Sequence, residues 1–130
     1  MNELLREWVA KAEGDCATAL REHRARTKPN HDAVCFHAQQ CIEKYLKAEL
    51  QRNNVPSPKI HDLAQLVNLS LPIHPLWESM RPELTALTRY AVLSRYPGES
   101  ATRTEAKKAV AVMKSVRTEI RQALGLGIRG

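Results

Sequence analysis

The chain has 130 residues, 43% of them apolar and 26% charged, which is typical of one globular domain and excludes a disordered or fibrous chain. Six aromatic residues are too few for a β-sandwich or for a sheet that stacks on nucleic-acid bases. The net charge is +6, and residues 107–130 contribute +5 of it. This last segment is either where a polyanionic partner binds or a solvated helix face.

Apolar residues at spacings of three and four predict helices along the whole chain. The first helix covers about residues 2–24. The second covers about residues 32–52, where Asp32 is placed to cap the helix and the polar face consists of Gln39, Glu43, Lys44 and Lys47. A short third helix is expected from residue 61 or 62 to residue 68.

The fourth predicted helix covers about residues 78–94, and a loop with a Pro-Gly pair follows it. The last helix begins near residue 100 or 102, because Thr102 and Glu105 have the spacing of a capping box. It ends before Gly125, and residues 128–130 are expected to fray.

Together these elements predict an all-α fold, a five-helix up-and-down bundle with three long helices and two shorter ones. We expect a single domain of residues 1–130, with an ordered core at about 2–124. No apolar run reaches the length of a membrane helix and the first residues do not resemble a signal peptide, so a cytoplasmic location is expected. Three cysteines without a CxxC pair predict buried thiols rather than a metal site, and no cofactor motif is present.

Four short segments carry a family resemblance. Residues 36–48 (FHAQQCIEKYLKA) stand in the second predicted helix. The other three are a spaced set in the first predicted helix (Trp8, Ala12 and Asp15), residues 61–63 (HDL) and residues 95–97 (RYP). In this order they resemble the HEPN (higher eukaryotes and prokaryotes nucleotide-binding) family from about residue 8 to residue 124. The resemblance implies a five-helix, HEPN-like bundle that usually forms a symmetric dimer.

The resemblance also implies partners and an activity to look for. Many bacterial and archaeal members are encoded beside a minimal nucleotidyltransferase and form a two-component module with it. A large subset are metal-independent RNases with an Arg, four to six residues and then a His near a late helix. Counting from Arg95, that spacing leads to Ser100, Ala101 and Thr102, none of which is a histidine.

RNA cleavage by this route needs an imidazole to transfer protons, so we predict no catalytic residue and favour a protein that is not an enzyme. One alternative stays open. Arg26 and His31 have the spacing of the RNase motif, although they lie before the second helix. They form either a displaced catalytic site or an exposed loop.

The preferred ligand-binding residues are Arg95 and Tyr96, since a guanidinium held in a Pro-Gly loop can bind a phosphate with two hydrogen bonds. The cationic edge of the last helix extends this set with Lys107, Lys114, Arg117 and Arg121. In the opposing interpretation, Tyr96 packs on the bundle and Arg95 pairs with Glu99 or another carboxylate.

The second helix offers a further candidate surface. A polar groove or dimer contact, or else plain solvated surface, is formed by His37, Gln40, Lys44 and Lys47. His61 is expected to begin the third helix, with its ring bonded to a backbone group.

The sequence therefore suggests a non-catalytic, homodimeric HEPN-family module without metal, cofactor or membrane. It would bind a nucleotide, RNA or a partner nucleotidyltransferase in a toxin–antitoxin-like pair. The alternatives are an RNase toxin that uses Arg26 and His31, and a scaffold that only holds a protein partner.

Overall fold

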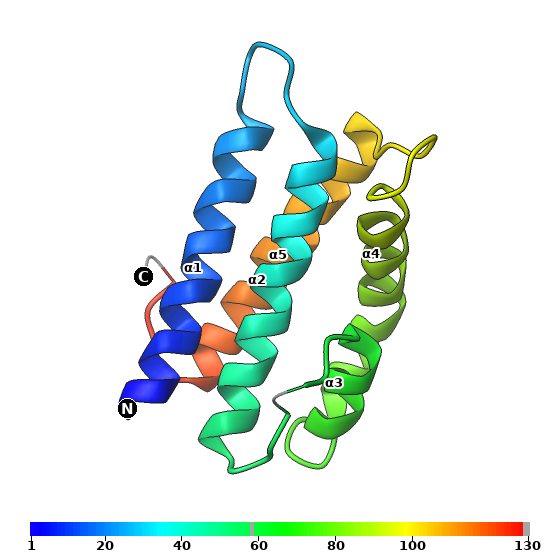
Figure 1. The fold of residues 1–130 in the computed structure, drawn as a ribbon. Coiled ribbons are helices and arrows are strands. Elements are labelled where there is room, and N and C mark those ends of the chain that lie inside the picture. The colour runs from blue at the N-terminus through cyan, green and yellow to red at the C-terminus, as the bar shows by residue number, and fades with distance from the viewer. Residues whose placement is uncertain (58, 129–130) are drawn as a thin grey trace.

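The structure is a computed structural model that describes residues 1–57 and 59–128. The described residues form helices and no strand, which confirms the all-α fold with five α-helices (Figure 1). In chain order the elements are α1 (Glu3–His23), α2 (His31–Arg52), α3 (Leu63–Ser70), the 3-10 helix η1 (Pro75–Met80), α4 (Arg81–Leu93) and α5 (Arg103–Ala123).

Helix α2 is the centre of the bundle. It runs antiparallel to α1, with α5 on its far side and the α3–α4 segment along its other flank (Figure 1). It contacts each of the other four α-helices. The expected solvated polar face is therefore wrong for Gln39, Glu43 and Lys47, which are buried because neighbouring helices cover that side of α2.

Of the two helix caps predicted from the sequence, one is confirmed and one is wrong. Thr102 and Glu105 form the predicted capping box at the start of α5. At α2 the cap is Asn30, whose side chain accepts from the N–H of Ala33 at 3.0 Å. Asp32 instead accepts a hydrogen bond of 2.6 Å from the N–H of Ala101, in the loop before α5.

The start of α3 differs in a smaller way. Asp62 caps the helix, so His61 lies just outside it. The His61 ring does not bond a backbone group as expected, because its Nδ1 lies 3.1 Å from a carboxylate oxygen of Glu43 on α2.

The fourth helix begins later than predicted, at Arg81, and residues 75–80 form a 3-10 helix instead. The cause is Pro82, which has no N–H to bond the carbonyl of Glu78 and whose ring would clash with it in an α-helix. Pro82 is acceptable in the first turn of α4, where no such bond is needed.

Three helices are joined by hydrogen bonds inside the bundle. Glu13 of α1 accepts two hydrogen bonds of 2.7 Å from the guanidinium of Arg117 on α5, and a third from the Tyr45 hydroxyl on α2. Arg121 donates to the Tyr45 oxygen at 3.0 Å. We call Glu13, Tyr45, Arg117 and Arg121 the Glu13 network.

The residues after α5 turn back against the bundle. Arg121 donates to the carbonyl of Gly127, and Arg117 donates to the carbonyl of Ile128. The expected fraying is therefore wrong at Ile128, while Arg129 and Gly130 lie outside the described residues.

Candidate functional site

The alternating directions of the helices bring four helix ends together at the upper end of the molecule. The last turn of α1, the first turn of α2, the end of α4 and the first turn of α5 meet there (Figure 1). The hydrogen bond from Ala101 to Asp32 fixes the loop after α4 to the start of α2. Residues that are 69 positions apart in sequence are thus neighbours in space.

Arg95 and Tyr96 stand in this loop, at the end of α4. The guanidinium carbon of Arg95 lies 5.5 Å from the centroid of the Phe36 ring on α2, a cation–π contact. No carboxylate of residues 1–57 and 59–128 forms an ion pair with Arg95, so the opposing interpretation is wrong on this point. Tyr96 does not pack on the bundle either, because it is 61% exposed.

The predicted cationic edge of α5 divides into two kinds of residue. Lys107 and Lys114 are exposed and have no ion-pair partner in the described part of the chain. Arg117 and Arg121 belong to the Glu13 network, and Arg121 is buried. Two of the four predicted cations therefore bind groups within the chain, because the carboxylate of Glu13 faces this side of α5.

Burial alone would raise the pKa of Glu13, but the hydrogen bonds from Arg117 and Tyr45 and the charges of Arg117 and Arg121 outweigh it. The pKa of Glu13 is therefore held below its usual range. The carboxylate of Glu13 is therefore ionised at neutral pH, and it balances part of the positive charge of Arg117 and Arg121.

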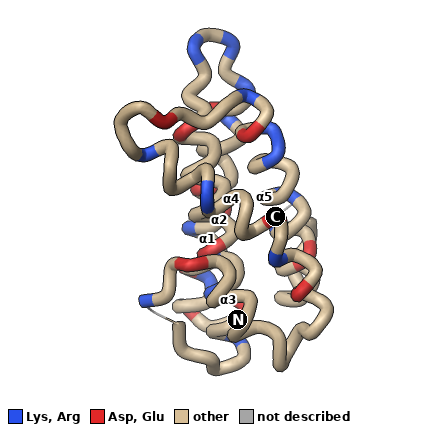
Figure 2. Tube along the Cα trace, turned by 90° about the vertical axis from the view of Figure 1, so that its right-hand side faces the viewer, with Lys and Arg blue, Asp and Glu red and all other residues tan. Residues whose placement is uncertain are grey.

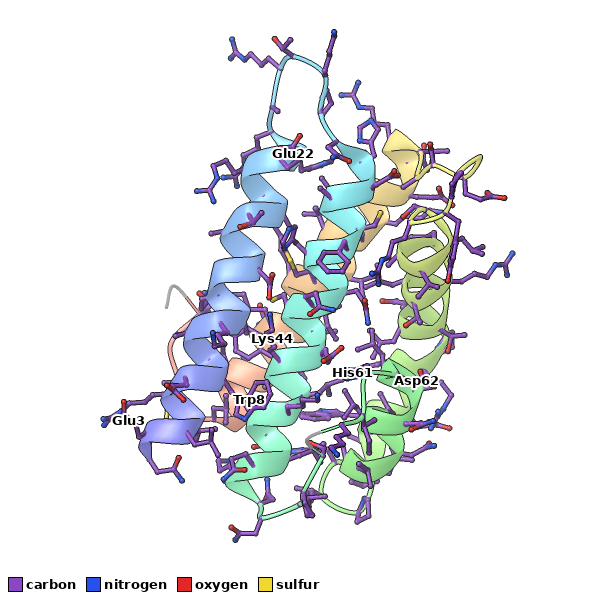
Figure 3. All side chains as sticks on the ribbon, in the orientation of Figure 1. Glu3, Trp8, Glu22, Lys44, His61 and Asp62 are labelled. Carbon is purple, nitrogen blue, oxygen red and sulfur yellow. The ribbon has the colours of Figure 1, made fainter. Side chains whose placement is uncertain are left out.

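The predicted polar surface of α2 lies largely against α1. Asp15 of α1 accepts from His37 at 2.8 Å and also from Lys44, which Figure 3 shows between the two helices. Lys47 pairs with Glu43 at 3.3 Å, and its ammonium lies 5.5 Å from the Trp8 ring centroid. These side chains hold α1 to α2, and Gln40 beside them is half-buried.

Arg26 and His31 are brought together by the structure. Both line one pocket of about 390 Å³ at the upper end, together with His23, Arg24 and Arg103. His23 and Arg24 were not among the site residues predicted from the sequence. The available signal was the shortness of the α1–α2 loop, which places the last turn of α1 beside the first turn of α2.

Within the described residues, no group of three or more His, Cys, Asp or Glu side chains is placed to hold a metal ion. No described helix is both long and apolar enough to cross a membrane. The cytoplasmic location stays a prediction.

The model of the HEPN domain family matches residues 5–123, nearly the whole chain. The chain belongs to the HEPN family. No curated protein and no solved structure gives a significant match to it. This match confirms the resemblance predicted from the sequence, at the level of family and fold. HEPN domains are generally associated with nucleotides and RNA, and they often dimerise.

In this HEPN domain, two of the three positions where an RNase would carry its histidine have structural roles instead. Ala101 is buried and its N–H binds Asp32. The Thr102 hydroxyl accepts from the N–H of Glu105 as part of the helix cap. Neither residue has an imidazole or another group that could transfer a proton near neutral pH.

Proposed function

We propose that this HEPN domain is a non-catalytic module that binds RNA or a nucleotide through Arg95 and Tyr96. The observation that carries the proposal is the position of Arg95, which rests on Phe36 and has no carboxylate partner among the described residues. A guanidinium in this state can bind a phosphate with two parallel hydrogen bonds. The exposed ring of Tyr96 can stack on a base.

The electrostatic part of the proposal rests on α5. Lys107 and Lys114 are exposed lysines without ion-pair partners in the described residues, and both add positive potential along that helix. Contacts between such cations and phosphates release counterions, so the affinity for RNA should fall as the salt concentration rises. We leave Arg117 and Arg121 out of the proposed surface because they are bound within the chain.

Replacing both Arg95 by Gln and Tyr96 by Ala is expected to weaken binding of a short single-stranded RNA by about tenfold or more. The loss combines one charge-assisted phosphate contact with one stacked base. Fluorescence anisotropy with a labelled oligonucleotide at low salt would measure it. Arg89→Gln is the matched control, because Arg89 is an exposed arginine of α4, the helix before this loop, with no ion pair in the described residues.

The same assay separates the proposal from its alternatives. Equal affinities for the double variant and for Arg89→Gln would contradict the assigned site, and affinity that does not change with salt would contradict the phosphate contacts. RNA cleavage that is lost in His31→Ala would favour the RNase alternative instead. Failure to bind RNA or nucleotide, combined with tight binding of a protein partner, would favour the scaffold.

We further propose that two copies associate along the end of α4. Val92 and Leu93 are both more than 40% exposed there, next to the exposed Tyr96. Adjacent exposed apolar side chains of this size often mark a protein interface. The resemblance to RNase members, in which the dimer joins two Arg-containing motifs, supports the same surface.

Light scattering is expected to give twice the chain mass of 14.7 kDa for the natural sequence. Leu93→Asp should shift the protein to a monomer, because a buried unpaired charge is costly in an apolar interface. Leu76→Asp is the control, since Leu76 is 86% exposed and lies in η1, away from the end of α4. A dimer that survives Leu93→Asp would place the interface elsewhere.

The family resemblance also supports a minimal nucleotidyltransferase as the protein partner, in a toxin–antitoxin-like pair. Binding of RNA or a nucleotide at Arg95 would then present that ligand to the partner enzyme. Size-exclusion chromatography of the two proteins together tests this association.

A further inference from the structure

A second cationic site lies at the tip of the α1–α2 hairpin. The end of α1, the loop after it and the first residues of α2 and α5 surround a pocket of about 390 Å³. Its lining residues are His23, Arg24, Ala25, Arg26, Pro29, His31 and Arg103. No acidic side chain of the described residues lines this pocket, and Figure 2 shows basic positions at the tip of the hairpin.

The three arginines of the pocket are available to bind a ligand. Arg24, Arg26 and Arg103 are exposed, and none forms an ion pair with a carboxylate of the described residues. The nearest acids in sequence already accept hydrogen bonds from backbone N–H groups: Glu22 from Asn30, Asp32 from Ala101, and Glu105 from Thr102. The guanidinium groups are thus free to bind an external anion.

Two helices add to the positive potential. His31 is the first residue of α2, and Arg103 is the first residue of α5. The positive ends of both helix dipoles therefore meet at the pocket, and helix N-termini favour anions. Both helices exceed 20 residues, so each dipole is fully developed.

Two histidines, His23 and His31, also line the pocket. The Nδ1 atom of His31 is buried and has no hydrogen-bond partner in the described residues. Burial lowers the pKa of His23, and the neighbouring His31 ring and the charges of Arg103, Lys114 and Arg24 lower it further. A bound anion would oppose this shift, because it would favour the protonated form of His23.

We propose that this pocket binds a phosphate group, supplied either by a free nucleotide or pyrophosphate or by the terminus of an RNA. The three guanidinium groups would bind the phosphate oxygens. The two imidazoles would form the wall of the site on the side of α1 and α2. The site is separate from Arg95 and Tyr96, and it does not depend on the function proposed for them.

The test is a titration with inorganic pyrophosphate, followed by NMR at the imidazole signals of the five histidines. We expect saturable shifts for His23 and His31 and none for His37, His61 and His74. The double variant Arg26→Gln/Arg103→Gln should weaken pyrophosphate binding by about tenfold or more, because it removes two guanidinium groups that would make charge-assisted hydrogen bonds to the phosphate oxygens. Both side chains are exposed and unpaired in the described residues, so the thermal unfolding of the variant should be unchanged.

Lys11→Gln is the control for the loss of charge, since Lys11 is exposed on α1 and does not line the pocket. Displacement of pyrophosphate by an RNA with a 5′-phosphate, but not by one with a 5′-hydroxyl, would identify an RNA terminus as the ligand. Binding of pyrophosphate or nucleotides alone would identify a free phosphate compound. The absence of saturable shifts at millimolar pyrophosphate, or equal binding by the double variant and Lys11→Gln, would overturn the proposal.

Discussion

Replacement of Glu49 by Gln is expected to lower the free energy of unfolding by about 3 kcal/mol, since charge-assisted hydrogen bonds contribute about 1.5–3 kcal/mol each. Glu49 is fully buried in α2. Its two oxygens accept from Arg52 at 2.6 and 3.0 Å, and one of them also accepts from His74 before η1. The amide of Gln has only one oxygen, so it cannot keep the hydrogen bonds that both oxygens of the carboxylate accept.

The effect should reach beyond this contact, because His74 is part of a longer chain of interactions. Its ring stacks on Trp77 at 3.8 Å with an interplanar angle of 8°. The indole N–H of Trp77 donates to Glu119 of α5 at 3.2 Å. Glu49 therefore orients the side chains that join α2 to η1 and α5 at the lower end of the molecule.

The pH dependence of this effect has a definite sign. Burial alone would raise the pKa of Glu49, but the hydrogen bonds from Arg52 and His74 outweigh it and hold the pKa below its ordinary value of 4.5. The unfolded chain then binds this proton more readily than the folded chain. The stabilisation is complete above about pH 4.5 and is lost as the pH falls through the lower folded-state pKa.

Urea denaturation at several pH values measures both the loss of unfolding free energy and its dependence on pH. The difference between the natural protein and Glu49→Gln should be greatest near neutral pH and should shrink in acid. Glu78→Gln is a matched control, because Glu78 also pairs with an arginine three residues on, at 2.7 Å, but is 57% exposed. We expect it to cost less than about 0.5 kcal/mol. Equal losses for the two variants would contradict the role assigned to burial.

Replacement of Glu13 by Gln is expected to cost about 2–3 kcal/mol, slightly less than the change at Glu49, because the Glu13 side chain is 30% exposed. The substitution removes the counter-charge of Arg117 and an acceptor of the Tyr45 hydroxyl. Arg121 loses a carboxylate oxygen at 3.9 Å while remaining buried. A buried arginine without its counter-charge is unfavourable.

Urea denaturation is again the measurement, now with Glu7→Gln as the control. Glu7 is an exposed residue of α1 and forms no ion pair with a described residue, so its replacement should change stability by less than about 0.5 kcal/mol. A Glu13→Gln variant as stable as Glu7→Gln would show that Arg117 and Tyr45 find water or other partners at no cost.

The sequence predicted those parts of the fold that depend on local patterns. Apolar stripes placed α1, α2 and α5 within two or three residues of their observed ends, and the spacing of Thr102 and Glu105 predicted the capping box. The errors at Asp32 and His61 have another cause. Both side chains bond groups far away in sequence, Ala101 and Glu43, and a local pattern carries no information about such partners.

The candidate site shows the same division. Arg95 and Tyr96 were predicted from a loop motif, and in the structure Arg95 lies on Phe36 while Tyr96 is exposed. Arg117 resembled Lys114 on the helical wheel, but the partner that binds it, Glu13, stands 104 residues earlier in the chain. Only the packing of α1 against α5 distinguishes a cation bound within the chain from one available to RNA.

The central position of α2 determines how this protein should lose its structure. Because α2 contacts every other α-helix, none of them can detach without exposing apolar surface on it. Partial opening is therefore costly at every edge of the bundle. Denaturation should proceed as one cooperative transition between two states, which allows the losses at Glu49 and Glu13 to be compared on a single free-energy scale.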